Sequence, residues 1–348
     1  MDPAKSGEEA GRGLAAAALA AAEGFEFRTF LCGTRPPPDL GEREADAFRK
    51  GANRGLTLAL DAAWGGTRTV DLRAPEASFH VRFPGGTVTL EFAPLAVAGR
   101  YRKHSRSLPQ TPFHCRECRG RGCRACGGSG RLVPGSVAEL VLPALVEASG
   151  ATGGTFHGCG REDVDVRMLG TGRPFAVLLE SPRRRTMDLA ACAARANAAA
   201  AGAAEFLDLA PSSREAMRLL TSVHPAKRYR ARVEVEGGAT AEDAALLART
   251  LTGARIEQRT PERVAGRRAD LVRPRTVLGA EAALLPDGAL ELSLRTEGGT
   301  YVKELISGDG GRTVPSVSSL LGRPARCVVL DVLEIESAET AEKGDGRN

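Results

Sequence analysis

Four of the eight cysteines lie close together in the sequence and have the spacing of a metal site. Cys115, Cys118, Cys123 and Cys126 form two Cys-x-x-Cys pairs within CRECRGRGCRAC. Each pair can direct two thiolates at one ion, and four thiolates complete the tetrahedral shell of structural zinc. The neighbouring glycines permit the tight turns that such knuckles need. The spacing therefore predicts a structural zinc site in a reducing compartment, with a disulfide or a redox pair as the alternative.

Charged side chains are concentrated in a second segment, GCGREDVDVRMLGTGRPF, over residues 158–175. A carboxylate held among cations keeps a low pKa and stays ionised, as a nucleophile or a base requires. Asp163 and Asp165 are both candidates, and their spacing does not separate them. The structural alternative is a loop carboxylate that is neutralised by Arg161 and Arg167.

Basic residues cluster between Arg100 and Arg131, where nine arginines and lysines face one acidic residue, Glu117. Such a patch is typical of a polyanion-binding surface, because contacts with phosphates release condensed counterions. A second arginine-rich stretch covers residues 255–275. The three tyrosines, Tyr101, Tyr229 and Tyr301, all have basic neighbours, a setting that favours stacking on nucleobases. The alternatives are solvated loops and core tyrosines.

Composition and missing motifs narrow the function. The sequence of 348 residues is 42% hydrophobic and has no apolar run of the roughly 20 residues that cross a bilayer, so we expect no membrane partner. It has no GxGxxG loop, no GxxxxGK[ST] loop and no HExxH pair. These features favour an RNA chemistry that uses no nucleotide cofactor and no catalytic metal.

The elements that must position these residues are mixed. A Pro-Gly-Gly turn between alternating segments predicts a β-hairpin over residues 78–92, after a helix from residue 41 to about 60. Asp188 and a Ser212–Glu215 capping box are expected to begin two further helices. Other strands are expected over residues 175–179, 230–236 and 327–335, and another helix over residues 240–251.

Several motifs together resemble the archaeal and eukaryotic family ten of the pseudouridine synthases. They are GREDVDVRMLGTGRPF, KRYRARVEV, RVAGRRADLVR and GGTYVKELISGDGGRTVPS, with AGRYRKHSRSLPQTPFHC upstream. The resemblance implies an α+β fold: a mixed, largely antiparallel catalytic sheet with helices, a smaller α/β THUMP-like RNA-binding accessory domain, and a zinc knuckle. The expected organisation is a disordered or weakly helical tail (1–24), the accessory domain (25–105), the basic zinc-binding segment (106–135), the catalytic domain (136–336) and a polar tail (337–348).

The resemblance also implies roles for particular residues. Asp163 matches the catalytic aspartate and Lys303 the basic residue that pairs with it. Tyr229 matches the tyrosine that stacks on uracil, Tyr301 and Leu305 line the same pocket, and Arg161 organises the loop or the flipped backbone. We expect RNA contacts from a larger basic and aromatic set: Arg100, Tyr101, Arg102, Lys103, Arg106, Arg267 and Arg268.

The function implied is isomerisation of uridine 54, uridine 55 or both in the T-loop of tRNA, without a cofactor for catalysis. We expect a cytoplasmic, monomeric enzyme that binds tRNA at the T-loop and elbow. The alternative is a non-catalytic zinc protein of the RNA-binding or chaperone type, because the two CxxCxGxG units are similar to the zinc repeat of DnaJ chaperones. A methyltransferase would need a glycine-rich cofactor loop that the sequence lacks.

Overall fold

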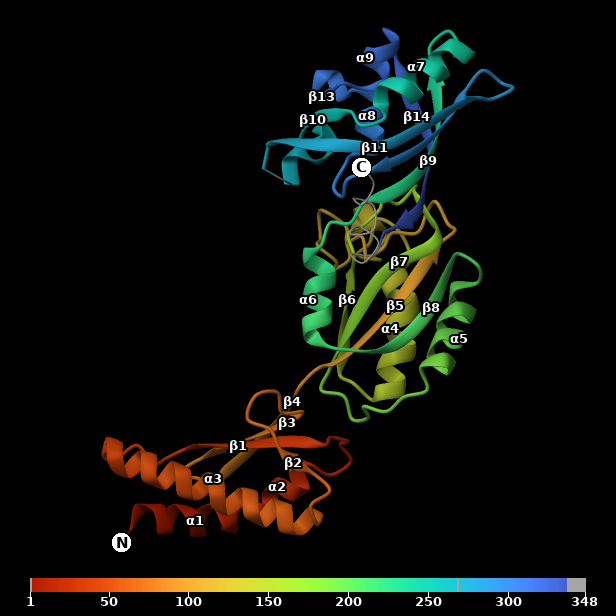
Figure 1. Cartoon of the computed structure of the whole chain (residues 1–348). Coiled ribbons are helices and arrows are strands. Elements are labelled where there is room, and N and C mark those ends of the chain that lie inside the picture. Colours follow the sequence, from red (N-terminus) through yellow and green to blue (C-terminus); the bar gives the residue numbers. More distant parts are fainter. Residues whose placement is uncertain (1, 268, 337–348) are drawn as a thin grey trace.

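The computed structural model describes residues 2–267 and 269–336, which form a small N-terminal unit and a larger sheet. Figure 1 shows the N-terminal unit at one end of an elongated molecule. Its four-stranded sheet has the order β2-β1-β3-β4. The elements of this unit are α1 (Pro3–Gly13), α2 (Ala15–Ala21), β1 (Thr29–Arg35), α3 (Glu42–Trp64), β2 (Thr69–Val70), β3 (Ala77–Arg82) and β4 (Thr87–Phe92).

The predicted hairpin and helix are both present in this unit. β3 and β4 pair antiparallel from Ala77↔Phe92 to Arg82↔Thr87, whereas β1 runs parallel to both β2 and β3. Aromatic rings fill the space between sheet and helices, with Phe30 and Phe79 fully buried and Trp64 edge-on to Phe30 at 5.1 Å. This aromatic core makes the unit a separate packing centre from the large sheet.

Within residues 1–24, expected to be a disordered or weakly helical tail, residues 3–13 and 15–21 are helical and packed in the structure rather than a free tail. α1 and α2 are helices that pack on α3, and the contact between α1 and α3 uses glycines from both helices. A methyl group at Gly7 would lie 2.3 Å from the Phe48 carbonyl oxygen, and one at Gly51 would lie 2.1 Å from that of Ala4. Glycines spaced by four residues form one smooth helix face, which lets the two backbones touch.

The expected end of the accessory domain, at residue 105, is also wrong. β5 (Leu95–Lys103) leaves the N-terminal unit and pairs with β7 on one side and β8 on the other. The small unit therefore ends near residue 94, and residues 95–103 are a central strand of the large sheet. The alternating pattern of β5 looks the same for an edge or a central strand, so the sequence did not locate this boundary.

The ten-stranded sheet has the order β13-β10-β11-β12-β9-β14-β7-β5-β8, with β6 on β7. Its pairings are antiparallel except for β14 with β7, which confirms a mixed α+β fold. The strands not yet given are β6 (Gly153–Gly158), β7 (Arg167–Glu180), β8 (Ala204–Ser212), β9 (Lys227–Val235), β10 (Arg255–Arg259), β11 (Val272–Leu284), β12 (Leu290–Thr296), β13 (Thr313–Val314) and β14 (Ala325–Ile335).

Short helices cover this sheet and close its connections (Figure 1). They are α4 (Val137–Ser149), α5 (Leu189–Ala200), α6 (Arg214–Ser222), α7 (Ala241–Leu251), α8 (Val302–Ser307) and α9 (Val317–Leu321), with 3-10 turns η1 (Arg124–Cys126), η2 (Glu262–Arg267) and η3 (Asp309–Gly311). Asp188 caps α5 as predicted, but α6 is capped by Ser213 rather than Ser212. No helix in the described ranges is long and apolar enough to span a membrane. The predicted polar tail, residues 337–348, lies outside the described residues.

The glycine contact between α1 and α3 can be tested with Gly51→Ala. The added methyl would meet backbone of α1, and we expect the free energy of unfolding of the N-terminal unit to fall by about 1–3 kcal/mol. Gly13→Ala is the control, because nothing lies within 4 Å of a methyl there and alanine favours the helix. The single tryptophan, Trp64, reports this unit in urea titrations followed by fluorescence. Equal stabilities of the two variants would contradict the packing.

Candidate active site

The loop between β6 and β7, residues 159–166, is anchored by a buried carboxylate. Glu162 accepts a hydrogen bond of 2.8 Å from Nε of Arg173, and the Tyr101 hydroxyl lies 2.9 Å from its Oε1. The side chains of Glu162 and Arg173 are each only 1% exposed. Burial is the largest influence on the pKa of Arg173 and would lower it, but the charge of Glu162, the hydrogen bond to it and the nearby tyrosines together raise that pKa. Strand β7 thus holds the loop through the buried ion pair of Arg173 with Glu162, and strand β5 adds the hydrogen bond from Tyr101.

A buried lysine fixes the backbone of the same loop. Nζ of Lys103 donates to the carbonyl oxygens of Asp163 at 3.1 Å, Val164 at 2.8 Å and Leu108 at 2.9 Å. Burial lowers the pKa of Lys103 to about 8, against the opposing charge of Glu162. Since an ammonium has three donors, these carbonyls satisfy it fully. Lys103 therefore sets where the Asp163 main chain lies.

The residues around β5 correct part of the predicted RNA surface. Tyr101 and Lys103 are both 0% exposed, so neither can stack on or bind RNA. Arg100, Arg102 and Arg106 are half-buried and donate to carbonyl oxygens of Thr171, Gly170 and Asp165, respectively. Arg106 also pairs with Asp331. The basic side chains of this stretch form hydrogen bonds within the protein. β5 is a central strand, and the neighbouring segments supply the carbonyl oxygens that accept these bonds.

The carboxylate of Asp163 projects from this rigid loop toward cations of the other half of the sheet. Nη1 of Arg263, in η2, lies 3.2 Å from its Oδ1, and Nζ of Lys303, in α8, lies 3.4 Å from its Oδ2. Lys303 lies closer to Asp165, at 2.7 and 2.8 Å. Partial burial raises the pKa of Asp165, but Lys303 outweighs it and the net shift is downward. Asp163 and Lys303 are thus brought together as predicted, with Asp165 as a competitor.

Arg263 is the contact that sequence reasoning missed. Its guanidinium bridges Asp163 and the buried Glu304, with Nε 2.6 Å from Oε1 of Glu304. Glu304 is 5% exposed and follows Lys303 on α8, so one turn of helix supplies both partners. Arg263 lies in the RVAGRRADLVR motif, but nothing in the sequence distinguishes it from the arginines at 267 and 268. Of Arg267 only the backbone is described, and Arg268 lies outside the described residues.

Sheet register places Tyr229 on the same face as the loop. Neighbouring strands align Leu294, Tyr229, Val332, Met168 and Lys103 in one row. Registered neighbours point to the same face, and strands lie about 4.8 Å apart, so Tyr229 is roughly 10 Å across the sheet from Met168. Burial raises the pKa of Tyr229 to about 12, which keeps its hydroxyl protonated.

The remaining predicted residues differ in position. Leu305 is 0% exposed and packs in the core, so it does not line an open surface in this structure. Tyr301 caps α8 and is half-buried, and its backbone N–H and C=O both bond to the side chain of Gln258. Arg161 is exposed and makes no hydrogen bond or ion pair within residues 2–267 and 269–336. Arg161 is therefore available to a ligand.

The four cysteines of the knuckles converge as the spacing predicts. Their Sγ atoms all lie within 4.8 Å of one another, and three pairs are 3.7–3.8 Å apart. Four sulfurs placed tetrahedrally about 2.3 Å from a zinc ion would be about 3.8 Å apart. Backbone N–H groups of Gly122, Cys123 and Gly130 each donate to a cysteine sulfur at 3.2 Å. The donor set fits a tetrahedral structural metal.

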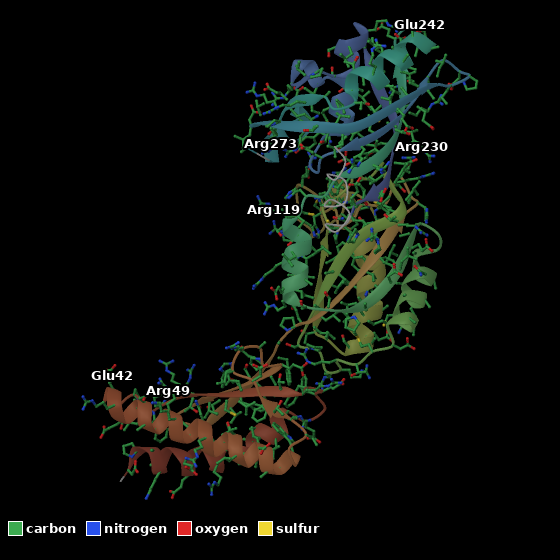
Figure 2. All side chains as sticks on the ribbon, in the orientation of Figure 1. Glu42, Arg49, Arg119, Arg230, Glu242 and Arg273 are labelled. Atoms are coloured by element: carbon green, nitrogen blue, oxygen red, sulfur yellow. The ribbon has the colours of Figure 1, made fainter. Side chains whose placement is uncertain are left out.

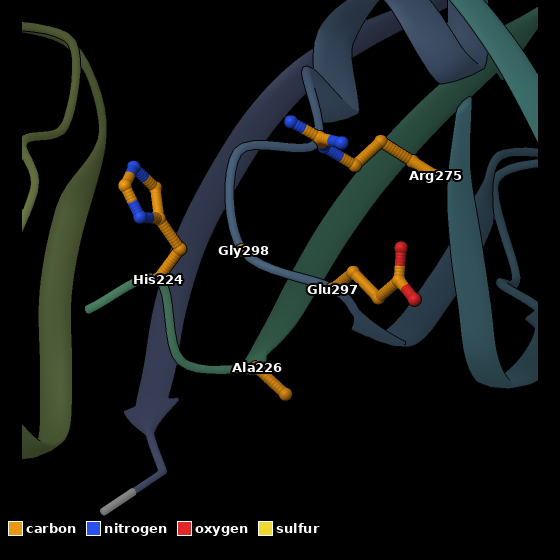
Figure 3. A pocket seen from close by; sticks show the side chains of 5 residues that line it. All are labelled: His224, Ala226, Arg275, Glu297 and Gly298. Atoms are coloured by element: carbon orange, nitrogen blue, oxygen red, sulfur yellow. The ribbon is translucent and has the colours of Figure 1, made fainter. Parts of the chain in front are cut away.

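A pocket lies beside the strand that carries Tyr229. It has a volume of about 430 Å³ and is lined by His224, Ala226, Arg275, Glu297 and Gly298 (Figure 3). That volume is in the range of small-molecule sites. Ala226 immediately precedes β9, and Gly298 precedes Tyr301 by three residues, so the pocket adjoins two of the predicted substrate-binding segments. Figure 2 labels Arg119, Arg230 and Arg273, three arginines of the larger part of the molecule, away from the N-terminal unit.

The buried anchor predicts an asymmetric mutational response. Glu162→Ala leaves the buried Arg173 without an anionic partner, and we expect a loss of about 3–5 kcal/mol in the free energy of unfolding. Tyr101→Phe removes a hydroxyl that donates to Glu162 and accepts from Gln110, and it is expected to cost less, about 1.5–3 kcal/mol. Denaturant titrations of both variants measure the difference. A Glu162→Ala protein as stable as Tyr101→Phe would show that the pair does not hold the loop.

Comparisons with known proteins identify one family. The family model described as "Pus10, C-terminal" matches residues 96–336. The chain is 44% identical over 329 residues to the tRNA pseudouridine synthase Pus10 of Korarchaeum cryptofilum, covering 91% of this chain and 88% of that protein. It is 40% identical over 332 residues to the protein of the same name from Pyrococcus furiosus, covering 91% and 79%.

Among solved structures, one chain of "Crystal Structure of a Cbf5-Nop10-Gar1 Complex" is similar at a TM-score of 0.37 and 17% identity, covering 70% of this chain and 51% of that one. The family model spans more than half of the sequence, and the relatives are matched over most of their length. The chain therefore belongs to the Pus10 family, whose named relatives are tRNA pseudouridine synthases.

Proposed function

We propose that this chain isomerises uridine 54, uridine 55 or both in the T-loop of tRNA, with Asp163 as the nucleophile. The observation that carries the proposal is the position of Asp163. Its backbone is held by Lys103, while its carboxylate remains 39% exposed between Arg263 and Lys303. A fixed and accessible carboxylate is what attack at a sugar carbon requires.

The reaction conserves every atom of the nucleotide. The bond between N1 of uracil and C1′ of ribose breaks, the base turns, and C5 bonds to C1′ while the C5 proton is lost and N1 gains one. Asp163 would attack or stabilise C1′, and no cofactor is needed for the atoms to balance. The target uridine must leave the T-loop stack to reach the site.

Two cations, Lys303 and Arg263, contact the Asp163 carboxylate. Arg263 and Lys303 place two positive charges within 3.4 Å of the Asp163 carboxylate. Lys303 also contacts Asp165, so it can move between the two carboxylates when RNA enters. Tyr229 would stack on the uracil and Arg161 would meet the flipped backbone. Asp165 is the weaker candidate for the nucleophile, because its side chain is 64% exposed and already holds Lys303 at 2.7 Å.

The other parts of the chain fit RNA recognition. We propose that the N-terminal unit is the THUMP-like accessory domain, ending near residue 94, and that the enzyme acts as a cytoplasmic monomer on the elbow of tRNA. The cysteine module would hold a structural zinc. Its exposed arginines, Arg116, Arg119 and Arg124, have no acidic partner among the described residues and are suited to phosphates.

The nucleophile is tested by Asp163→Asn in an assay of pseudouridine at each T-loop position of a tRNA transcript. We expect the rate to fall by at least about 10³-fold while tRNA affinity is kept. Asp165→Asn is the matched control and should lose less than about tenfold, because an exposed ion pair is worth at most about 1 kcal/mol. Product from Asp163→Asn at the wild-type rate would refute the assignment. An inactive wild type that binds tRNA would favour the non-catalytic RNA-binding alternative.

The metal is tested by elemental analysis of the purified protein. We expect one zinc per chain, with loss of zinc and a lower Tm in Cys118→Ser, because each thiolate supplies one ligand. Cys327→Ser, on β14 and outside the cluster, should keep the metal. A zinc-free protein with a disulfide between two of the four cysteines would support the redox alternative instead.

A further inference from the structure

Lys227 is a half-buried lysine that the proposed mechanism has not used. It begins β9 two residues before Tyr229, and the burial pattern of the strand puts both side chains on the same face. No hydrogen bond or ion pair of its ammonium is found in the described parts of the chain. A partly desolvated ammonium without an acceptor is costly, so a protein retains one only for a reason beyond packing.

The ammonium lies directly against the catalytic loop. A methyl group at Gly160 would be 3.4 Å from Nζ of Lys227 and 3.3 Å from Nη1 of Arg173. Arg173 already has partners, Glu162 and the Cys159 carbonyl oxygen. The nearest buried carboxylate, Glu162, is therefore already paired with Arg173, and no described group on the loop forms a hydrogen bond or ion pair with Nζ of Lys227.

Comparison with Lys103 shows what is unusual. Lys103 is fully buried under the same loop, but three carbonyl oxygens accept from it. Burial lowers the pKa of Lys227 to about 8 as well, and here the neighbouring charge of Arg173 lowers it further. Only Cys159 and Glu162 oppose these effects. The ammonium is thus poised to accept an anionic or carbonyl partner from outside the chain.

We propose that Lys227 is a further catalytic residue, whose ammonium donates a hydrogen bond to a carbonyl oxygen of the target uracil. This inference rests on the proposed function. When the bond between N1 and C1′ breaks, its electron pair stays on the base, and the negative charge spreads over N1 and the carbonyl oxygens. A fixed cation at those oxygens stabilises the charge where it develops. The charge is removed again when C5 bonds to C1′, after which C5 loses its proton and N1 gains one.

The position of Lys227 favours the base over a phosphate. Residues two apart on a strand are about 6.8 Å apart, so a lysine beside a tyrosine that stacks under a ring can reach the edge of that ring. Lys227 is also half-buried beneath the loop, whereas phosphates remain on the solvent side, where Arg161 is exposed.

The test compares Lys227→Met and Lys227→Arg with Arg228→Met as the matched control. Arg228 is the adjacent residue on the opposite face of β9, where it pairs with Glu334 at 3.1 Å. Single-turnover pseudouridine formation, tRNA Kd and Tm are measured for each full-length protein. We expect Lys227→Met to slow the reaction by about 10²–10³-fold with Kd changed less than about threefold. Lys227→Arg should recover part of the rate, and Arg228→Met should react as the wild type does.

Stability separates this role from a structural one. Removing an unpaired charge should leave Tm unchanged or raise it at pH 7, whereas loss of a structural lysine would lower it. The folded pKa of Lys227, about 8, is below that of the unfolded chain, so the charge penalises folding at low pH. Any gain in Lys227→Met should therefore shrink as the pH rises through 8 to 9.

Three results would overturn the inference. They are an unchanged rate in Lys227→Met, a loss that lies entirely in Kd as for a phosphate contact, and a fall in Tm that accounts for the lost activity. An inactive wild type would refute the proposed function and this inference together. An active wild type with an equally active Lys227→Met would refute the inference alone.

Discussion

The buried ion pair between Glu162 and Arg173 is the interaction on which the rest of the site depends. Glu162 directly precedes Asp163 in the chain, so the side chain next to the proposed nucleophile is the anchor of the loop. A buried pair of this kind adds little to stability compared with apolar packing. A conformation that separates the two charges is strongly destabilised, because each charge is then buried without its partner. The value of the pair is in specifying one loop conformation, to which Tyr101 and Lys103 also contribute.

The backbone of Asp163 is held by buried groups, whereas its carboxylate makes only partly exposed contacts. Those contacts are with Arg263 and Lys303. Lys303 lies in α8, and Arg263, in η2, is held beside α8 because its guanidinium pairs with Glu304. The Asp163 carboxylate lies where the part of the large sheet with β5, β7 and β8 meets the part that carries η2 and α8. A polyanion that binds both parts therefore also acts on Arg263 and Lys303, the charge partners of Asp163.

The sequence located the chemistry better than it located its supports. The cysteine spacing and the GRED segment are local patterns, and the structure brings together the cysteines and places Lys303 beside Asp163 as expected. The prediction that Tyr101 and Lys103 contact RNA was wrong, because a strand with basic and aromatic residues has the same sequence pattern whether it is central or exposed. Arg263 and Lys227 were missed because their importance depends on residues more than 30 positions away. The packed N-terminal helices were missed because glycines seldom indicate close helix contact in a charged, alanine-rich segment.

The path of β5 has a consequence for how this protein can change over evolution. One strand of nine residues, roughly 30 Å long, leads from the N-terminal unit to the lysine that holds the Asp163 loop. Inserting or deleting one residue within it would turn Lys103 to the opposite face of the sheet. We therefore expect a change of chain length to be tolerated in the connection before Leu95 or in the turns of the small unit, and not within β5. The spacing between the accessory unit and Asp163 is set by a strand whose length cannot drift one residue at a time.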